Sequence, residues 1–425
     1  MSEKQGIDLQ IFIKVYEAKE YDEAIALGKM FTKEFPGSGT GWNVLGLSYK
    51  ASGNIPEAIK IFKSLVKALP KSPIYRSNLG NTYMLIGRIR EAISCFKQAI
   101  KRDPKLINAI EALGLAFLEV DREEAALKCF KRVIQLDPDN QRTLYYIGNM
   151  HLNNLNWVSA GEHLKRSGFG LSQSHYLECL LSLGKGAEFV DFYTKLTDSG
   201  ITNPLIGGLV AHAEELYGKR LNNSFCNNSL DHIYVGRVEE QHGFTDKLAG
   251  ELIDYHHGSK NDYRSQALLQ FGTQSSGNLF LVNEPFVKSL EACIENQIDH
   301  YREMFKDSDQ GFLKNWPEQY KLFGWMVSIK SGGNLNSHNH KEGWLSGSYY
   351  LSLPERSEEG KDDGKIAFSY RGPRYPAIDK PIYKEVMDIK KRDICMFPSS
   401  LFHETIPFDG TEERISFAFD VIPTR

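Results

Sequence analysis

Residues 73–104 read PIYRSNLGNTYMLIGRIREAISCFKQAIKRDP, and the pattern of this stretch recurs every 34 residues through the first half of the chain. A fixed period of this size is typical of an architecture in which each repeat is one structural unit. Apolar residues in each repeat recur at helical spacing and charged residues take the opposite face, so each repeat is expected to form a pair of amphipathic helices. The residues in register are Gly46, Gly80, Gly114 and Gly148; Ala24, Ala58, Ala92, Ala126 and Ala160; and Pro36, Pro70, Pro104 and Pro138.

These positions resemble the tetratricopeptide repeat, which has a small residue, an aromatic residue, an alanine and a proline at the same spacings. Phe62, Phe96 and Phe130 share one further register. The resemblance implies an all-α superhelix, which we expect over residues 1–170. The register is lost over residues 171–222, where we expect a helical capping or linker region.

A superhelix of this kind has a concave groove, and we expect the groove to hold a protein or peptide. A rigid spacer and a dimerisation surface remain the alternatives. The sequence does not fix the oligomeric state, and a homodimer stays open.

The composition sets limits on the class of protein. A chain of 425 residues exceeds what one hydrophobic core usually organises, so two or more domains are expected. The net charge of −3 argues against nucleic acid and membrane partners. The chain begins with neither a basic stretch nor an apolar run, and we expect a cytoplasmic protein.

The second half of the chain has a different pattern, with strand-like segments separated by Gly, Pro and Asn from Phe323 to the end. Short strands of this kind predict a jelly roll or barrel with helices outside it. We expect this domain over residues 223–425. The expected strands are Phe323–Lys330, Ser346–Leu353, Lys365–Tyr370, Ile394–Phe397 and Arg414–Ile422.

Three blocks in this half carry the candidate chemistry: NSHNHKEGWLSGSYYL at 336–351, FPSSLFH at 397–403 and RISFAFD at 414–420. Together they resemble the double-stranded β-helix oxygenases that use Fe(II) and 2-oxoglutarate, and within these the group with His-x-His followed by Ser-Gly-x-Tyr-Tyr. The resemblance implies Fe(II), 2-oxoglutarate as cosubstrate, and dioxygen. It implies no catalytic residues beyond the ligands of the metal and the cosubstrate.

Two histidines that lie two apart point the same way on an extended strand, and a third ligand can arrive from a distant strand. His338, His340 and His403 fit this geometry and are the expected metal ligands. The general pattern of these enzymes is His-x-Asp or His-x-Glu, so Glu342 paired with His340 is the alternative ligand. A histidine in place of the acid removes a negative charge from the iron, which should weaken metal binding.

The distal carboxylate of 2-oxoglutarate needs a fixed cation, and an arginine with a serine two residues on can present both groups to it. Arg414 and Ser416 are the expected cosubstrate-binding residues. Ser348 and Tyr350 share one face of their strand, and the resemblance implies a tyrosine hydroxyl on the keto acid there. Tyr350 is the candidate, and Tyr349 is expected to face the other way.

The resemblance thus implies a 2-oxoglutarate- and Fe(II)-dependent dioxygenase, a hydroxylase whose substrate is expected to be a protein or peptide side chain captured with the help of the repeats. The main alternative is an interaction or sensor protein with a catalytically impaired oxygenase fold. A zinc hydrolase or cupin-type isomerase is a third reading, and it predicts no dependence on a keto acid.

Overall fold

The computed structural model describes residues 8–238, 244–258, 263–264, 266–355 and 360–424. The chain divides into two compact units, of which the first comprises Met1–Pro138 and Ser276–Val287 and the second Asp139–Ser275 and Lys288–Arg425. Each unit is therefore discontinuous in sequence. The boundaries expected at residues 170 and 222 stay predictions.

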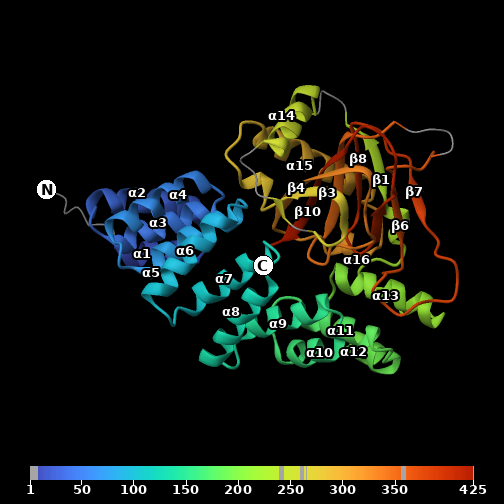
Figure 1. Ribbon diagram of the computed structural model, residues 1–425, viewed down its shortest axis with the longest axis horizontal. Helices are drawn as coiled ribbons and strands as arrows, with labels where there is room; N and C mark the ends of the chain where they lie inside the picture. The colour runs from blue at the N-terminus through green and yellow to red at the C-terminus, as the bar shows by residue number, and fades with distance from the viewer. Residues whose placement is uncertain (1–7, 239–243, 259–262, 265, 356–359, 425) are drawn as a thin grey trace. The chain divides into compact units, whose positions relative to one another are not determined.

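The first unit is built from helical hairpins, drawn in blue to cyan in Figure 1. Its helices are α1 (Leu9–Glu17), α2 (Tyr21–Glu34), α3 (Gly39–Ala51), α4 (Ile55–Ala68), α5 (Pro73–Leu85), α6 (Ile89–Arg102), α7 (Ile107–Leu118) and α8 (Glu123–Leu136), with the short η3 (Leu279–Leu281). The segment Ser276–Val287 contacts the hairpins through the amide of Asn278, which donates to the carbonyl of Leu85 at 3.1 Å.

The recurring glycines permit close contact between the two helices of a hairpin. A Cβ placed on Gly80 would lie 2.6 Å from the ring of Phe96, and one on Gly114 would lie 2.6 Å from the ring of Phe130. Both phenylalanines are fully buried. Each aromatic ring therefore occupies the space that a side chain at the glycine would need, which explains why the two registers occur together.

Five further helices belong to the second unit: α9 (Gln141–Asn153), α10 (Trp157–Arg166), α11 (Ser172–Ser182), α12 (Gly186–Asp198) and α13 (Pro204–Tyr217). The repeat packing continues into α9 and α10, where a Cβ on Gly148 would meet Leu164 at 2.7 Å. Helix α13 begins with the Asn203 cap and Pro204, and ends at Gly218 in the left-handed conformation, φ 61°.

The rest of the second unit is a pair of antiparallel sheets (Figure 1). The larger has the order β1-β8-β5-β10-β4-β3-β2 and the smaller β7-β6-β9. The strands are β1 (Tyr234–Arg237), β2 (Tyr263–Arg264), β3 (Leu269–Ser275), β4 (Tyr320–Leu335), β5 (Leu345–Ser352), β6 (Ile366–Ser369), β7 (Glu385–Met387), β8 (Asp393–Pro398), β9 (Phe402–Thr405) and β10 (Arg414–Pro423). The accompanying helices are η1 (Ser229–His232), α14 (Asp246–His257), α15 (Phe286–Met304) and α16 (Gly311–Lys314).

Side chains from both sheets form one core. Tyr350 of β5 and Phe397 of β8 pack with Ile366 and Phe368 of β6. The expected fold class, an all-α repeat array followed by a jelly roll with flanking helices, is confirmed. Each of the five expected strands is present. Within the described part of the chain, none of the helices combines the length and apolar character needed to cross a bilayer.

Candidate metal and cosubstrate site

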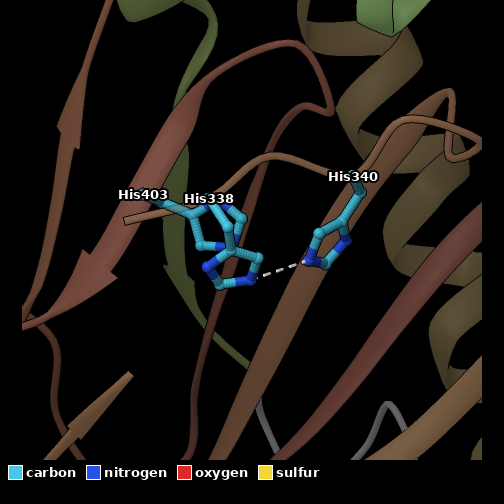
Figure 2. Close-up of side chains that lie close together, drawn as sticks. All are labelled: His338, His340 and His403. Carbon is cyan, nitrogen blue, oxygen red and sulfur yellow. Dashed lines mark hydrogen bonds between the residues drawn. The ribbon is translucent and has the colours of Figure 1, made fainter. Parts of the chain in front are cut away.

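Three histidines from two segments lie close together (Figure 2). His338 and His340 lie between β4 and β5, and His403 lies in β9. The amide of His338 donates to the carbonyl of His403 at 3.0 Å, and the amide of His403 donates back at 2.8 Å. This reciprocal pair places the side chains together, and one ring nitrogen from each histidine lies within 4.8 Å of the others.

In each of the three rings, Nδ1 lies close to an oxygen atom. Nδ1 of His338 lies 2.8 Å from the Asn336 carbonyl, and Nδ1 of His403 lies 3.3 Å from the Leu401 carbonyl. Nδ1 of His340 lies 2.6 Å from Oδ1 of Asp420. An acceptor at Nδ1 fixes the proton there and leaves Nε2 with its lone pair. The Nε2 atoms of His338 and His340 are 3.4 Å apart, joined by the dashed line in Figure 2.

The rings of His338 and His403 carry little positive charge at neutral pH. Burial, with His340 beside it, lowers the pKa of His338 to about 4. Burial and the other two histidines hold the pKa of His403 well below its usual value. Neutral imidazoles whose lone pairs converge have no proton to share, and a divalent cation is the species that satisfies all of them at once. The donor set thus fits a metal ion that accepts imidazole ligands.

Glu342, the alternative ligand, is not part of this cluster; its side chain lies elsewhere on the wall of the same cavity. The carboxylate next to the histidines is Asp420 of β10, which accepts from His340 and from the Ser346 hydroxyl, both at 2.6 Å. Sequence analysis did not select Asp420. The signal was present, because Asp420 lies in phase with Arg414 and Ser416 at the period of two that a strand imposes.

The histidines open into a cavity of about 720 Å³ whose lining includes Ser348, Arg414 and Ser416. Arg414 is 4% exposed, and its Nε donates to the Gly364 carbonyl at 2.8 Å. Its guanidinium lies 5.1 Å from the ring centre of Tyr350. Ser416 is 3% exposed, and its hydroxyl lies 3.5 Å from Nη1 of Arg414. A buried guanidinium and a hydroxyl thus adjoin one cavity, the arrangement that a carboxylate needs.

The two neighbouring tyrosines have different surroundings. Tyr350 is fully buried in the core between the sheets, beneath the Arg414 guanidinium, and is not among the residues that line the cavity. Tyr349 stacks on Phe244, with ring centres 3.7 Å apart. Burial raises the pKa of Tyr350 far above its usual value, so its hydroxyl keeps its proton.

Known families match both halves of the chain. Residues 324–420 match the family described as "Putative 2OG-Fe(II) oxygenase". Tetratricopeptide repeat families match residues 45–72, 73–106 and 107–140. The chain thus joins a segment that matches tetratricopeptide repeats to a segment that matches a 2OG-Fe(II) oxygenase family.

Several solved structures are similar to part of this chain. "Crystal structure of MamA" is 23% identical, with 38% of this chain and 94% of that chain covered, at a TM-score of 0.34. A thermophilic tetratricopeptide repeat protein from Thermus thermophilus is 19% identical, covering 41% and 97%, at 0.37. A tetratricopeptide repeat protein from Parabacteroides merdae is 13% identical, covering 48% and 84%, at 0.41. No curated protein matches the chain.

Residues of two helices, which no sequence motif marked, form part of the cavity wall. Tyr145, Asn149 and Leu152 of α9 line it, as do His175 and Glu178 of α11. These positions on α9 are spaced by four and three residues, so they share one helical face. Helices α9 and α11 therefore form part of the same cavity as the histidines.

A substitution at Asp420 tests the effect of the charge of this side chain separately from the effect of its size. Asp420→Asn keeps the size of the side chain but removes the carboxylate that orients His340, so divalent metal affinity should fall by about 10–100-fold. Isothermal titration with Co(II) measures the change. Asp299→Asn removes an exposed carboxylate on α15 and serves as the matched control. Equal affinities for the two variants would contradict the role given to Asp420.

Proposed function

We propose that the chain is a 2-oxoglutarate- and Fe(II)-dependent dioxygenase that hydroxylates a protein or peptide side chain. The observation that supports this most directly is the convergence of three imidazole nitrogens at a cavity that also contains a buried arginine and serine. The match to an oxygenase family over residues 324–420 agrees with this chemistry.

In the proposal, His338, His340 and His403 hold Fe(II), and their Nδ1 partners keep each ring in the binding tautomer. Arg414 and Ser416 bind the distal carboxylate of 2-oxoglutarate. Ser348 lies on the cavity wall near the cosubstrate, and Tyr350 supports the Arg414 guanidinium from below. The bound metal and keto acid supply the activation of dioxygen. The protein positions the target bond and excludes water.

The proposed substrate class follows from the repeats. Tetratricopeptide repeats generally mediate contacts with other proteins, and helix α9, which directly follows the matched repeats, lines the cavity. A cavity of about 720 Å³ is larger than a small dicarboxylate fills, which leaves room for a side chain beside the metal. A cytoplasmic location is part of the same proposal.

A second candidate is a sensor that binds metal and keto acid without turnover. It is favoured by the histidine at position 340, where the general pattern of these enzymes has a carboxylate. Asp420 offsets this difference in part, because a carboxylate that accepts from His340 makes the imidazole a stronger donor.

The dioxygenase and the sensor differ in whether oxygen converts bound 2-oxoglutarate to succinate. Protein incubated anaerobically with Fe(II) and 2-oxoglutarate should develop a weak visible absorption band, and admission of oxygen should then yield succinate. A band without succinate, in the presence of candidate peptides, would favour the sensor. No band and no keto-acid binding would contradict both candidates. Mass spectrometry of captured proteins for a gain of one oxygen atom would identify the substrate.

A further inference from the structure

A buried carboxylate on α11 lies in the cavity wall and is bound from several sides. Glu178 is 1% exposed, and its helix is separate from the segments that carry the three histidines. The Lys341 ammonium lies 2.9 Å from each of its oxygens. Nδ1 of His175 lies 2.8 Å away, and the Tyr375 hydroxyl donates at 3.0 Å. Three partners from separate sequence regions therefore converge on one side chain.

The charge of Glu178 is stabilised by these partners. Burial alone raises the pKa of a carboxyl group, but here Lys341 and His175 outweigh burial and hold the pKa of Glu178 well below its usual value. Burial, and then Lys341, lower the pKa of His175, so its ring is a neutral donor at neutral pH. A buried ion pair with its remaining lone pairs satisfied keeps a defined geometry, whereas loss of one partner leaves a buried charge uncompensated.

The partner Lys341 directly follows a metal-site histidine. The segment around it is fixed on both sides, since the amide of His340 donates to Ser399 at 3.2 Å and the amide of Trp344 donates to Val421 at 2.7 Å. Between these anchors, the side chain of Lys341 crosses to α11. The Lys341 side chain is 27% exposed and lines the cavity, and its ammonium group pairs with Glu178.

We propose that Glu178 is a positioning residue for the metal centre, which holds the His338–His340 segment in place and neutralises the Lys341 ammonium beside the site. The inference rests on the proposed function, because it assumes that the three histidines bind a metal. It adds that α11, from the helical region that follows the repeats, completes the site.

Two physical effects explain how Glu178 would strengthen metal binding. Ligands that are held in place before the metal arrives lose less conformational freedom when it binds. In Glu178→Gln the lysine would also leave an uncompensated positive charge in the wall of the cavity, which opposes binding of a divalent cation. In Lys341→Met only the first effect remains. Both effects act on metal affinity, beyond any effect on the stability of the fold.

The test uses the full chain and Co(II), whose visible absorption reports the ligand geometry. Glu178→Gln and Lys341→Met should each weaken Co(II) binding by about tenfold or more and change the shape of the band. The double variant should bind no more weakly than the weaker single variant, because both changes break one contact. Asp191→Asn, which removes the acid of an exposed pair with Lys195, is the matched control and should bind as the wild type does.

Each outcome decides the question. Wild-type affinity in folded Glu178→Gln, checked by circular dichroism, would overturn the inference while leaving the proposed function intact. Independent, additive losses in the double variant would also overturn it. If Glu178→Gln does not fold, Lys341→Met alone decides by the same criterion. Failure of the wild-type chain to bind Co(II) would instead contradict the proposed function itself.

Discussion

Replacing His403 with alanine should lower divalent metal affinity by more than about 100-fold. This loss exceeds the roughly 10–100-fold typical of replacing a residue that only hydrogen-bonds to a metal ligand. The reason is geometric: His403 is the member of the cluster that comes from the smaller sheet, and its main chain exchanges two hydrogen bonds with His338. Alanine retains those main-chain bonds but removes the nitrogen. Two imidazoles from one short segment would remain.

Isothermal titration with Co(II) or Fe(II) under anaerobic conditions measures the loss, and the thermal midpoint of the unbound protein shows whether the fold is intact. His257→Ala is the matched control, because His257 is half exposed and lies in α14, outside the cluster of three histidines. A His403→Ala protein that is folded and still binds metal with wild-type affinity would rule out the three-histidine centre. Glu342 would then be the next ligand to replace.

Arg414→Met should abolish measurable binding of 2-oxoglutarate while metal binding stays within a few-fold of wild type. Methionine keeps much of the apolar stem that packs over Tyr350 but removes the guanidinium. A bidentate, charge-assisted contact to a carboxylate contributes about 3–4 kcal/mol, which corresponds to roughly 100- to 1000-fold in affinity. The measurement is titration of 2-oxoglutarate into the Mn(II)-loaded protein.

Arg302→Met provides the control, because Arg302 is an exposed arginine that also lies over an aromatic ring, that of Trp316. It should leave 2-oxoglutarate binding unchanged. If Arg414→Met bound the keto acid as tightly as wild type, the cosubstrate would bind elsewhere in the cavity. Lys321, another cation of the cavity lining, would be the first alternative.

Local contacts explain why so much of the fold could be predicted. The contact between Gly80 and Phe96 spans 16 residues, and the same contact recurs as Gly114 with Phe130, so a single period describes most of the first unit. The long β-strands could be predicted from the alternation of apolar and polar residues along their own sequences. Strand β4 is longer than expected, Tyr320–Leu335, because its polar, glycine-containing end is extended through pairing with β3 rather than by side-chain pattern.

Contacts between distant segments could not be predicted in this way. Strand β1 has four residues and pairs with β8, which begins at Asp393. Lys341 and Glu178 are 163 residues apart, and nothing in either local sequence marks the other. The three histidines were selected from motifs, and the structure brings their nitrogens together. Their role as ligands stays a prediction until metal binding is measured.

The discontinuous first unit has a consequence for synthesis on the ribosome. Its last segment, Ser276–Val287, follows Pro138 only after a long intervening stretch of chain, yet Asn278 binds the Leu85 carbonyl in that unit. At about 5–20 residues per second, translation needs on the order of ten seconds to supply this segment. During that interval the nascent helical hairpins lack the hydrogen bond between Asn278 and Leu85 and the other contacts of this segment.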